Sequence, residues 1–352
     1  MEIPEAATGS NPGRMAGREL DDCRSPSTYS GMATLQQLLI GSSRTFSVGI
    51  DLLPEPLRQE ITVAYLLLRV SDYLEDSELL ADDDKIAMLE DWRRALAGGG
   101  ERTALIARLG EAREDTPDAL VARDATTVLA GLDRMEPEAR EIVVRRVRES
   151  TAGMARWTRR GSVFNNEADL DDYMHEVAGR VGLLLTELFA LRLSGVAGSA
   201  ERMMKLGREF GLALQTVNVI RGLHEDPRRD WVYVPRSFVP EELQSPRAIF
   251  DPSNREAGMG VVARLAAKAD GHLAAARRYV ALIPRRHHRV RLFCLLPLFF
   301  AIRTLAVSRG NADVLRTEVK MTRDEVRAIT RHARVMGVSN RWIGWYCGRL
   351  AG

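Results

Sequence analysis

From Leu35 onward, apolar residues recur at three- and four-residue spacing along almost the whole chain. This period is typical of α-helices that bury one face, and extended runs of β-branched residues, which would favour strands, are missing. Several stretches exceed 20 residues and are apolar on more than one side, as the central helices of a bundle are. The expected helical stretches lie near 35–49, 56–76, 84–97, 117–132, 136–158, 168–194, 199–224, 256–282, 286–308 and 322–335.

Short breaks rich in Gly, Pro or Asp separate the helical stretches, and no period of 20–50 residues repeats, so a solenoid is not expected. The prediction is one all-α domain over 35–340. Residues 1–34 are rich in Gly, Pro, Ser and charge, which predicts a disordered arm without a signal peptide. Residues 341–352 form an aromatic and basic tail. The insertion at 77–104, with its run of three aspartates from Asp82, is interpreted as a solvated loop and not as a metal site.

Composition narrows the class of protein. The chain has 352 residues, of which 45% are hydrophobic and 28% charged, so a soluble globular protein with a substantial core is expected. Because the net charge is only +2 and the arginines are spread along the chain, we expect no nucleic-acid partner. Cys23, Cys294 and Cys347 are odd in number and far apart, which favours apolar fillers in a cytoplasmic protein over disulfides or a metal site.

Two segments bear on membranes. The apolar run 292–307 is interrupted by Arg303, contains Pro297, and falls short of the roughly 18–20 residues of a spanning helix, so we expect a buried helix. The tail that begins at Arg341 combines Trp and Tyr with a cation, as interfacial segments do. Peripheral membrane contact through this tail is therefore an alternative to simple packing or partner contact.

A polar stripe marks the stretch 65–76. Tyr65, Arg69, Asp72 and Asp76 advance by four, three and four residues, so they share one face of a helix that is otherwise mostly apolar. Carboxylates are rarely buried without partners, so a cation, a water-filled cavity or Arg69 must compensate them. Mg²⁺ fits, because it takes oxygen ligands, keeps several waters and is often completed by substrate phosphates. The alternative is an exposed helix end that carries ordinary acids.

A second stripe follows the same rule farther along the chain. Gln215, Asn218, Gly222 and Asp226 advance by three, four and four residues, and Arg221 lies beside them. Polar groups on a buried helix need a polar cavity. Arg suits bidentate phosphate binding. Two such helices, facing each other across a cavity, are expected to bind a metal-bridged diphosphate.

These motifs, in this order, resemble the squalene/phytoene synthase family of head-to-head trans-prenyl transferases. The resemblance runs from about Ser43 to Arg323, which is most of the chain. Residues 290–297, 301–306 and 319–321 are more similar to the squalene synthase branch. The family's substrate-entrance segment, first aspartate-rich motif, central signature, second aspartate-rich motif and flap are matched by 43–46 with 53–58, 65–76, 173–182, 215–226 and 231–235.

The resemblance implies an isoprenoid synthase helical bundle around a central cavity, with Mg²⁺ (or Mn²⁺) as cofactor. Two prenyl diphosphates, C15 favoured over C20, would be joined through a cyclopropyl diphosphate, and NADPH would be used if the product is squalene. The same resemblance implies the site residues. They are Asp72, Asp76, Asn218 and Asp226 for metal; Arg69, Gln215, Asn218 and Arg221 for diphosphate; Ser43, Phe46 and Tyr65 for the substrate entrance; and Tyr173, with Arg69, Asp72 and Asp76, for catalysis.

Gly179 and Gly182 belong to the central signature. They lie on a helix otherwise rich in leucine, so they would let either a substrate chain or another helix approach closely.

Gly222 departs from the family, which has aspartate there. His224 lies two residues off the stripe, so it is expected to be a surface histidine and not a replacement ligand. Water can complete a Mg²⁺ shell. Glycine inside a helix costs roughly 1 kcal/mol relative to alanine, which predicts that a substrate or backbone approaches closely at this point. The spacing of Asn218, Gly222 and Asp226 is also similar to the metal triad of class I terpene synthases.

Three hypotheses follow from Gly222. The first is a working head-to-head synthase, most simply a squalene synthase, with a water-completed metal site. The second is a relative with another outcome: a phytoene or dehydrosqualene synthase, an enzyme that stops at presqualene diphosphate, or a cyclase that uses one prenyl diphosphate. The third is a non-catalytic subunit that binds prenyl diphosphates.

Overall fold

The computed structural model describes residues 33–99, 102–228 and 231–352. These residues form helices and loops without a β-strand, which confirms the all-α prediction. The predicted N-terminal arm, with Cys23, lies almost wholly outside the described residues. The helices are α1 (Leu35–Ser42), α2 (Arg44–Asp51), α3 (Leu57–Asp76), α4 (Asp82–Leu96), α5 (Arg102–Gly110), α6 (Pro117–Arg123), α7 (Ala125–Asp133), α8 (Pro137–Arg160), α9 (Glu167–Met174), α10 (Arg180–Arg192), α11 (Ala200–Gly222), α12 (Arg255–Leu282), α13 (His288–Ser308), α14 (Arg323–Met336) and α15 (Asn340–Ala351).

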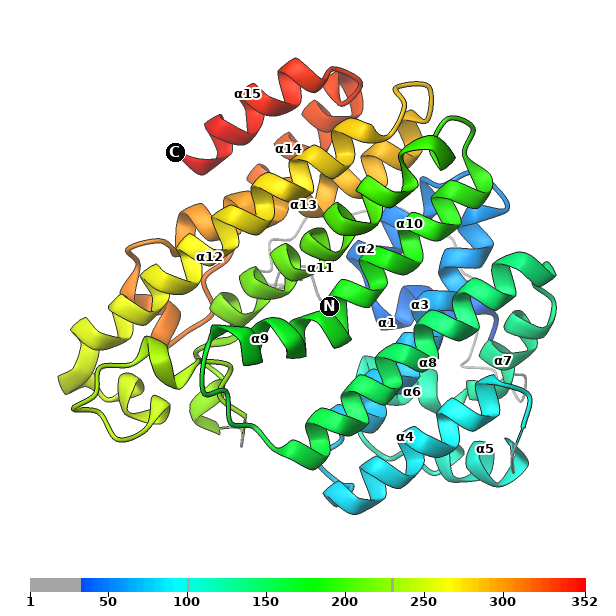
Figure 1. Ribbon diagram of the computed structural model, residues 1–352, viewed down its shortest axis with the longest axis horizontal. Coiled ribbons are helices and arrows are strands. Elements are labelled where there is room, and N and C mark those ends of the chain that lie inside the picture. The colour runs from blue at the N-terminus through cyan, green and yellow to red at the C-terminus, as the bar shows by residue number, and fades with distance from the viewer. Residues whose placement is uncertain (1–32, 100–101, 229–230) are drawn as a thin grey trace, which may run out of the picture.

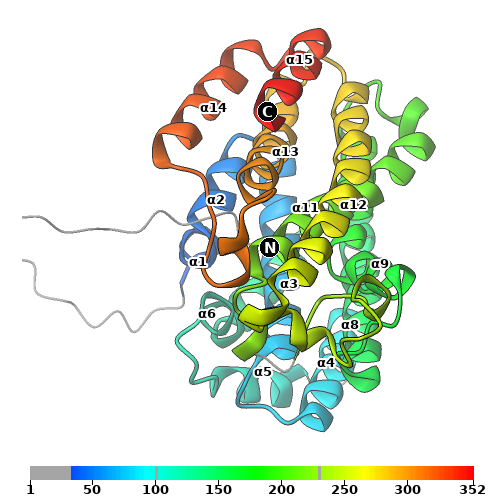
Figure 2. The same ribbon diagram turned by 90° about the vertical axis from the view of Figure 1, so that its left-hand side faces the viewer.

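Helix α11 lies at the centre of the bundle, where it packs against α10, α12 and α13. On the other side of α10, α3 and α8 pack together and are covered by the shorter helices α4 to α7 (Figure 1). Helices α14 and α15 lie at one end of the molecule and pack on α13 (Figure 2). Because α10 contacts both α3 and α11, the two polar stripes lie on helices that flank the same central element.

Local capping sets several helix boundaries. Thr34 and Gln37 form a capping box that starts α1, and Thr322 and Glu325 form another that starts α14. The hydroxyl of Ser43 accepts the backbone N–H of Phe46 at 3.2 Å, so the predicted single stretch 35–49 is divided into α1 and α2.

The loop prediction for 77–104 is wrong over most of that segment, whereas the predicted helical stretch 84–97 is confirmed. Most of this segment is α4, which packs against α8, and Trp92 is fully buried between them and the rest of the core. The aspartates at 82–84 form the exposed first turn of α4, where carboxylates interact favourably with the helix dipole. The tail also contains a helix, α15, whose Ile343, Tyr346 and Leu350 are buried.

Helix α13 confirms the expectation of a buried apolar helix. Among the described residues it is the one helix long and apolar enough to cross a membrane, yet 78% of its most apolar window is buried inside the protein. The side chain of Arg291 is fully buried in it and donates to the carbonyl oxygens of Val280 (3.0 Å), Ile283 (2.6 Å) and Gly337 (3.1 Å). This guanidinium therefore ties the C-terminal ends of α12 and α14 to the core.

The contact between α10 and α11 depends on glycine. A Cβ at Gly182 would lie 1.9 Å from the carbonyl oxygen of Gly207, and one at Gly211 would lie 2.2 Å from the carbonyl oxygen of Ala178. The backbones of the two helices are thus too close for any larger residue at these positions. Of the two explanations for Gly182, close approach of another helix is the one that the structure shows.

Gly182→Ala is expected to lower the free energy of unfolding by about 1–3 kcal/mol, as other changes that overpack a core do. Urea unfolding followed by circular dichroism measures it. The matched control is Gly260→Ala on α12, where the added Cβ meets no described atom within 4 Å; this variant should be stabilised by up to about 1 kcal/mol. Equal unfolding free energies for Gly182→Ala and wild type would contradict the packing described here.

Candidate active site

A cavity of about 140 Å³ lies between α3, α10 and α11. One end of the cavity is apolar and the other is charged, because α3 contributes apolar residues from its first half and charged residues from its last turns. The segment 173–185 lines the opposite wall. The apolar lining residues are Phe46, Ile61, Ala64, Leu68, Val177, Val181, Leu184 and Leu185, and the polar ones are Tyr65, Arg69, Asp72, Glu75, Asp76, Tyr173 and Gln215.

Most of the residues that the sequence predicts for the site meet at this cavity. Phe46, Tyr65, Arg69, Asp72, Asp76, Tyr173 and Gln215 all line it. Ser43, Asn218, Arg221 and Asp226 are not among the lining residues. Ser43 instead caps α2, and Arg221 forms an ion pair with Glu318 (3.8 Å).

The acidic end of the cavity surrounds one arginine. Arg69 is buried, with its Nη1 atom 3.3 Å from Asp72 Oδ2 and its Nε atom 2.5 Å from Asp118 Oδ1. Burial and the charge of Asp72 raise the pKa of the Asp118 carboxyl to about 7, although Arg69 opposes the shift. Burial, followed by the charges of Asp76 and Asp72, raises the pKa of Glu75 well above its usual range. The site therefore holds an excess of carboxylate that a cation would relieve.

Glu75 and Asp118 were not predicted from the sequence. Glu75 had a readable signal, because it lies three residues after Asp72 on the same helix face. Asp118 had none, since it comes from α6 and reaches Arg69 only through the packing of α6 on α3.

An aromatic wall surrounds Tyr173. Its ring lies 5.7 Å from the rings of Trp157 and Trp231, 5.6 Å from that of Phe164 and 5.4 Å from that of Tyr233, measured between centroids. The Tyr173 and Tyr233 hydroxyl oxygens are 3.5 Å apart. Burial raises the pKa values of both phenols, and the charges of Glu75 and Asp76 raise them further. Both phenols therefore stay protonated at neutral pH.

A π-helical turn, His175–Gly179, directly follows α9. The backbone next to Tyr173 therefore departs from regular α-helical geometry. The Ser150 hydroxyl on α8 donates to the carbonyl oxygen of Glu176 at 2.6 Å. The Glu176 carboxylate, buried in this turn, pairs with Arg180 and with Arg156, the latter at 3.3 Å. A Cβ at Gly153 would lie 2.3 Å from the carboxylate, so α8 has room for Glu176 only with glycine there.

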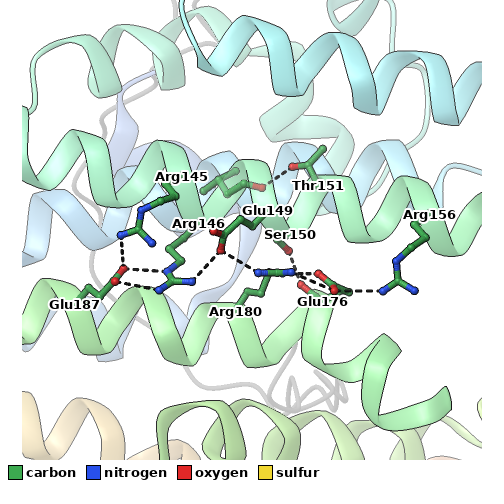
Figure 3. Close-up of polar contacts among 10 residues, drawn as sticks. Arg145, Arg146, Glu149, Ser150, Thr151, Arg156, Glu176, Arg180 and Glu187 are labelled. Atoms are coloured by element: carbon green, nitrogen blue, oxygen red, sulfur yellow. Dashed lines mark hydrogen bonds and ion pairs between the residues drawn. The ribbon is translucent and has the colours of Figure 1, made fainter. Parts of the chain in front are cut away.

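The ion pairs continue along α8 and α10 as a ladder (Figure 3). Glu149 bridges Arg146 (2.8 Å) and Arg180 (2.9 Å), and Glu187 accepts from both Arg145 and Arg146 at 2.9 Å. These side chains fix α10 against α8, and thus the position of the π turn and of Tyr173 beside it.

The second stripe differs from its prediction. Helix α11 ends at Gly222, so Asp226 lies in a following 3₁₀ turn and not on the same helical face. Asp226 is buried, and its Oδ2 atom accepts the backbone N–H of Tyr233 at 3.1 Å, which ties the 231–235 segment to the site. His224 is half-buried, not a surface residue, and its Nδ1 atom lies 3.0 Å from the Arg221 carbonyl oxygen.

Gly222 also lacks the crowding that the sequence predicts. An added Cβ there would meet no described atom within 4 Å. Gly222 is the last residue of α11 and does not adopt the left-handed backbone conformation, so neither crowding nor backbone geometry requires glycine at this position.

Within the described ranges, no three His, Cys, Asp or Glu side chains come close enough to form a metal site by themselves. The donor set of α3 nevertheless fits Mg²⁺, which is typically held by one or two carboxylates and completed by waters and substrate phosphates. The negative charges of Asp72 and Asp76 repel that of Glu75, and this repulsion is unfavourable until a cation neutralises it. The repulsion therefore also favours a metal ion at this end of the cavity.

The model of the Squalene/phytoene synthase family matches residues 39–325. The chain belongs to this family. It is 31% identical over 301 residues to the squalene synthase of Eremothecium gossypii, covering 81% of this chain and 64% of that protein. It is also 30% identical over 325 residues to the squalene synthase ERG9 of Saccharomyces cerevisiae, covering 87% of this chain and 69% of that protein.

The family's solved structures share this fold. The structure of TcSQS in complex with the ligand BPH1237 superposes with a TM-score of 0.76 at 24% identity, over 90% of each chain. The chain spans about 64% of the length of several curated relatives that it matches, among them the Eremothecium gossypii enzyme.

Titration of His175 gives a test of the π turn. Burial, with the charges of Arg180 and Arg208, lowers the pKa of His175 below 6.5. A depressed pKa contributes stability above the unfolded value that is lost as the pH falls through the folded value. The free energy of unfolding should therefore decrease as the pH falls below 6.5, and His175→Gln should weaken that dependence. His287→Gln on an outer loop serves as the control. An identical pH dependence of the unfolding free energy in wild type and His175→Gln would contradict the lowered pKa of His175.

Proposed function

We propose that the protein condenses two prenyl diphosphates head to head, with two molecules of farnesyl diphosphate as substrates and squalene as product. The observation that carries the proposal is the cavity, which joins an acidic, arginine-containing end to an apolar wall. A diphosphate group matches the first and a prenyl chain matches the second. Membership of the squalene/phytoene synthase family supports the same reading.

At the acidic end, Asp72, Glu75 and Asp76 would hold Mg²⁺, with Mn²⁺ as the alternative ion. When bound there, the ion supplies positive charge to the diphosphate leaving group. Arg69 and Gln215 bind diphosphate oxygens, and the protonated phenols of Tyr173 and Tyr233 donate hydrogen bonds as the allylic C–O bond breaks. The proposed metal roles of Asn218 and Asp226 on the second stripe, and the diphosphate role of Arg221, remain predictions.

At the other end, the walls protect the carbocation that ionisation leaves on the prenyl chain. The aliphatic side chains from α3 and α10 exclude water from it. The rings of Phe46 and Tyr65 are stacked with centroids 4.9 Å apart and offer π faces, which attract cations. The double bond of a second prenyl chain is then the nucleophile available in the cavity. Transfer of a proton to the released diphosphate closes the cyclopropyl ring, and ionisation of the second diphosphate leads to the C30 skeleton.

The choice of squalene over the alternative products rests on the similarity of this chain to squalene synthases. NADPH would supply the hydride that quenches the last cation. The relatives above are named squalene synthases, which supports both NADPH and C15 substrates. The open volume beside Gly222 leaves room for water to complete a metal shell, which favours a working synthase over a non-catalytic subunit.

Product analysis tests the proposal. Purified protein incubated with farnesyl diphosphate, Mg²⁺ and NADPH should release squalene, and omission of NADPH should abolish squalene. Geranylgeranyl diphosphate should react more slowly. A C15 hydrocarbon, or a C30 diphosphate formed equally with and without NADPH, would replace the proposal with a cyclase or a presqualene-only enzyme. Absence of turnover with intact substrate binding would leave the non-catalytic alternative.

Gly222→Asp tests the water-completed site. Because the position has room, the variant should fold, and the added carboxylate should lower the Mg²⁺ concentration that gives half-maximal activity by several-fold while the product stays the same. Gly222→Ala adds a Cβ without a ligand and is the matched control. A weaker Mg²⁺ response, or a changed product in Gly222→Asp alone, would show instead that glycine shapes the pocket.

We further propose that the protein contacts anionic membrane surfaces through α14 and α15. No Asp or Glu follows Glu325, whereas five arginines do, at 327, 331, 334, 341 and 349. Val335 is 70% exposed and Trp345 is 59% exposed. Met336 and Val338, which are close to Val335 in the sequence, are also exposed. Arginines around exposed apolar and indole side chains are the composition of interfacial helices, and each cation near an anionic surface contributes about 1 kcal/mol.

Flotation with vesicles measures this contact. The protein should float with phosphatidylcholine vesicles that contain phosphatidylserine, less in high salt, and less in a Val335→Ser/Trp345→Ala double variant. The control is Leu79→Ser, which removes an apolar side chain that is 68% exposed elsewhere on the molecule. Equal flotation of the double variant and wild type would exclude α14 and α15 as the contact surface.

A further inference from the structure

Arg69 is held by carboxylates from two different helices. Asp72, on its own helix, lies 3.3 Å from Nη1, and Asp118, on α6, lies 2.5 Å from Nε. The side chain of Arg69 is 5% exposed and that of Asp118 is 19% exposed, so water screens their interaction poorly. The closer contact is the one made from outside α3.

The first turn of α6 fixes Asp118 in place. Pro117 occupies the first helical position, and the Thr116 hydroxyl accepts the backbone N–H of Ala119 at 3.1 Å. A carboxylate in this turn also interacts favourably with the helix dipole. Since α6 packs against α3 with Ala119 and Val121 buried, the Asp118 carboxylate is held by backbone structure and not by a mobile loop.

We propose that Asp118 is a positioning residue that acts through Arg69 in the diphosphate reaction, an inference that rests on the proposed function. The Asp118 carboxylate forms an ion pair at the Nε side of the guanidinium, so the terminal Nη atoms face Asp72 and the cavity. With metal and diphosphate bound, Asp72 would serve the cation, and Nη1 would be available to a diphosphate oxygen. Asp118 keeps the guanidinium plane fixed meanwhile, as bidentate contact with a phosphate requires.

Asp118 contacts Arg69, which lines the cavity, but does not itself line the cavity. Its effect must therefore pass through the guanidinium. A merely structural role predicts something different: loss of the ion pair would reduce stability but would leave the diphosphate contacts of Arg69 unchanged.

The test compares Asp118→Asn with wild type in the full chain. Binding of inorganic pyrophosphate in the presence of Mg²⁺, measured by calorimetry, should weaken about tenfold, and kcat with farnesyl diphosphate should fall by at least that factor, with a smaller change in KM. Asp115→Asn, an exposed residue in the loop before α6, is the matched control and should behave as wild type. Wild-type pyrophosphate affinity in Asp118→Asn would overturn the proposal.

A double-variant cycle separates positioning from stability. In an Arg69→Lys background, Asp118→Asn should change pyrophosphate affinity less than twofold, because the group through which it acts is gone. Full additivity of the two changes would overturn the proposal. If Asp118→Asn does not fold, Asp118→Glu decides: it should keep the melting temperature but weaken pyrophosphate binding, and unchanged binding would count against positioning. Pyrophosphate binding needs no turnover, so an enzyme inactive on farnesyl diphosphate would refute the proposed function without deciding the role of Asp118.

Discussion

The end of α3 places three carboxylates, Asp72, Glu75 and Asp76, at one end of a cavity whose other end is apolar, and the rest of the site is arranged around their charge. Burial, together with the charges of Asp76 and Asp72, raises the pKa of Glu75, and the charge of Lys85 offsets only part of that rise. Such an arrangement is unfavourable without a ligand. It becomes favourable when divalent cations and a diphosphate arrive together, because the cation neutralises the acids and the diphosphate supplies its remaining oxygen ligands.

The scaffold holds this charge in one place by two different means. Glycines let α10 and α11 approach to backbone contact, which sets Gln215 on one wall of the cavity. A ladder of ion pairs fixes α8 against the π turn and α10, which sets Tyr173 on the same side (Figure 3). Close packing and a satisfied polar network both resist displacement, so the protonated phenol stays near the acidic end instead of collapsing into the core.

The sequence predicted what helical periodicity encodes. The stripe at Tyr65, Arg69, Asp72 and Asp76 was readable because side chains four residues apart share a face whatever the tertiary structure is. The same reasoning failed at Asp226, because it assumed that α11 continues beyond Gly222, whereas the helix ends there and Asp226 lies in the following 3₁₀ turn.

Contacts between helices that are distant in the sequence were not readable. Nothing near Asp118 indicates that it reaches Arg69, since that pair forms only when α6 packs on α3. Tyr233 lies in a segment whose resemblance to the family flap was visible, yet its place beside Tyr173 depends on the bond between its N–H and Asp226. Periodicity reports which face a residue occupies, whereas the partner of that face is decided by packing.

The central claim is that the acidic end of the cavity binds diphosphate only together with metal. Calorimetric titration with farnesyl thiodiphosphate, a substrate analogue that ionises slowly, tests it most directly. The account predicts tight binding in Mg²⁺, little binding in EDTA, and loss of the Mg²⁺-dependent part in an Asp72→Asn/Asp76→Asn variant. Equal affinity with and without Mg²⁺, or an unaffected double variant, would contradict it.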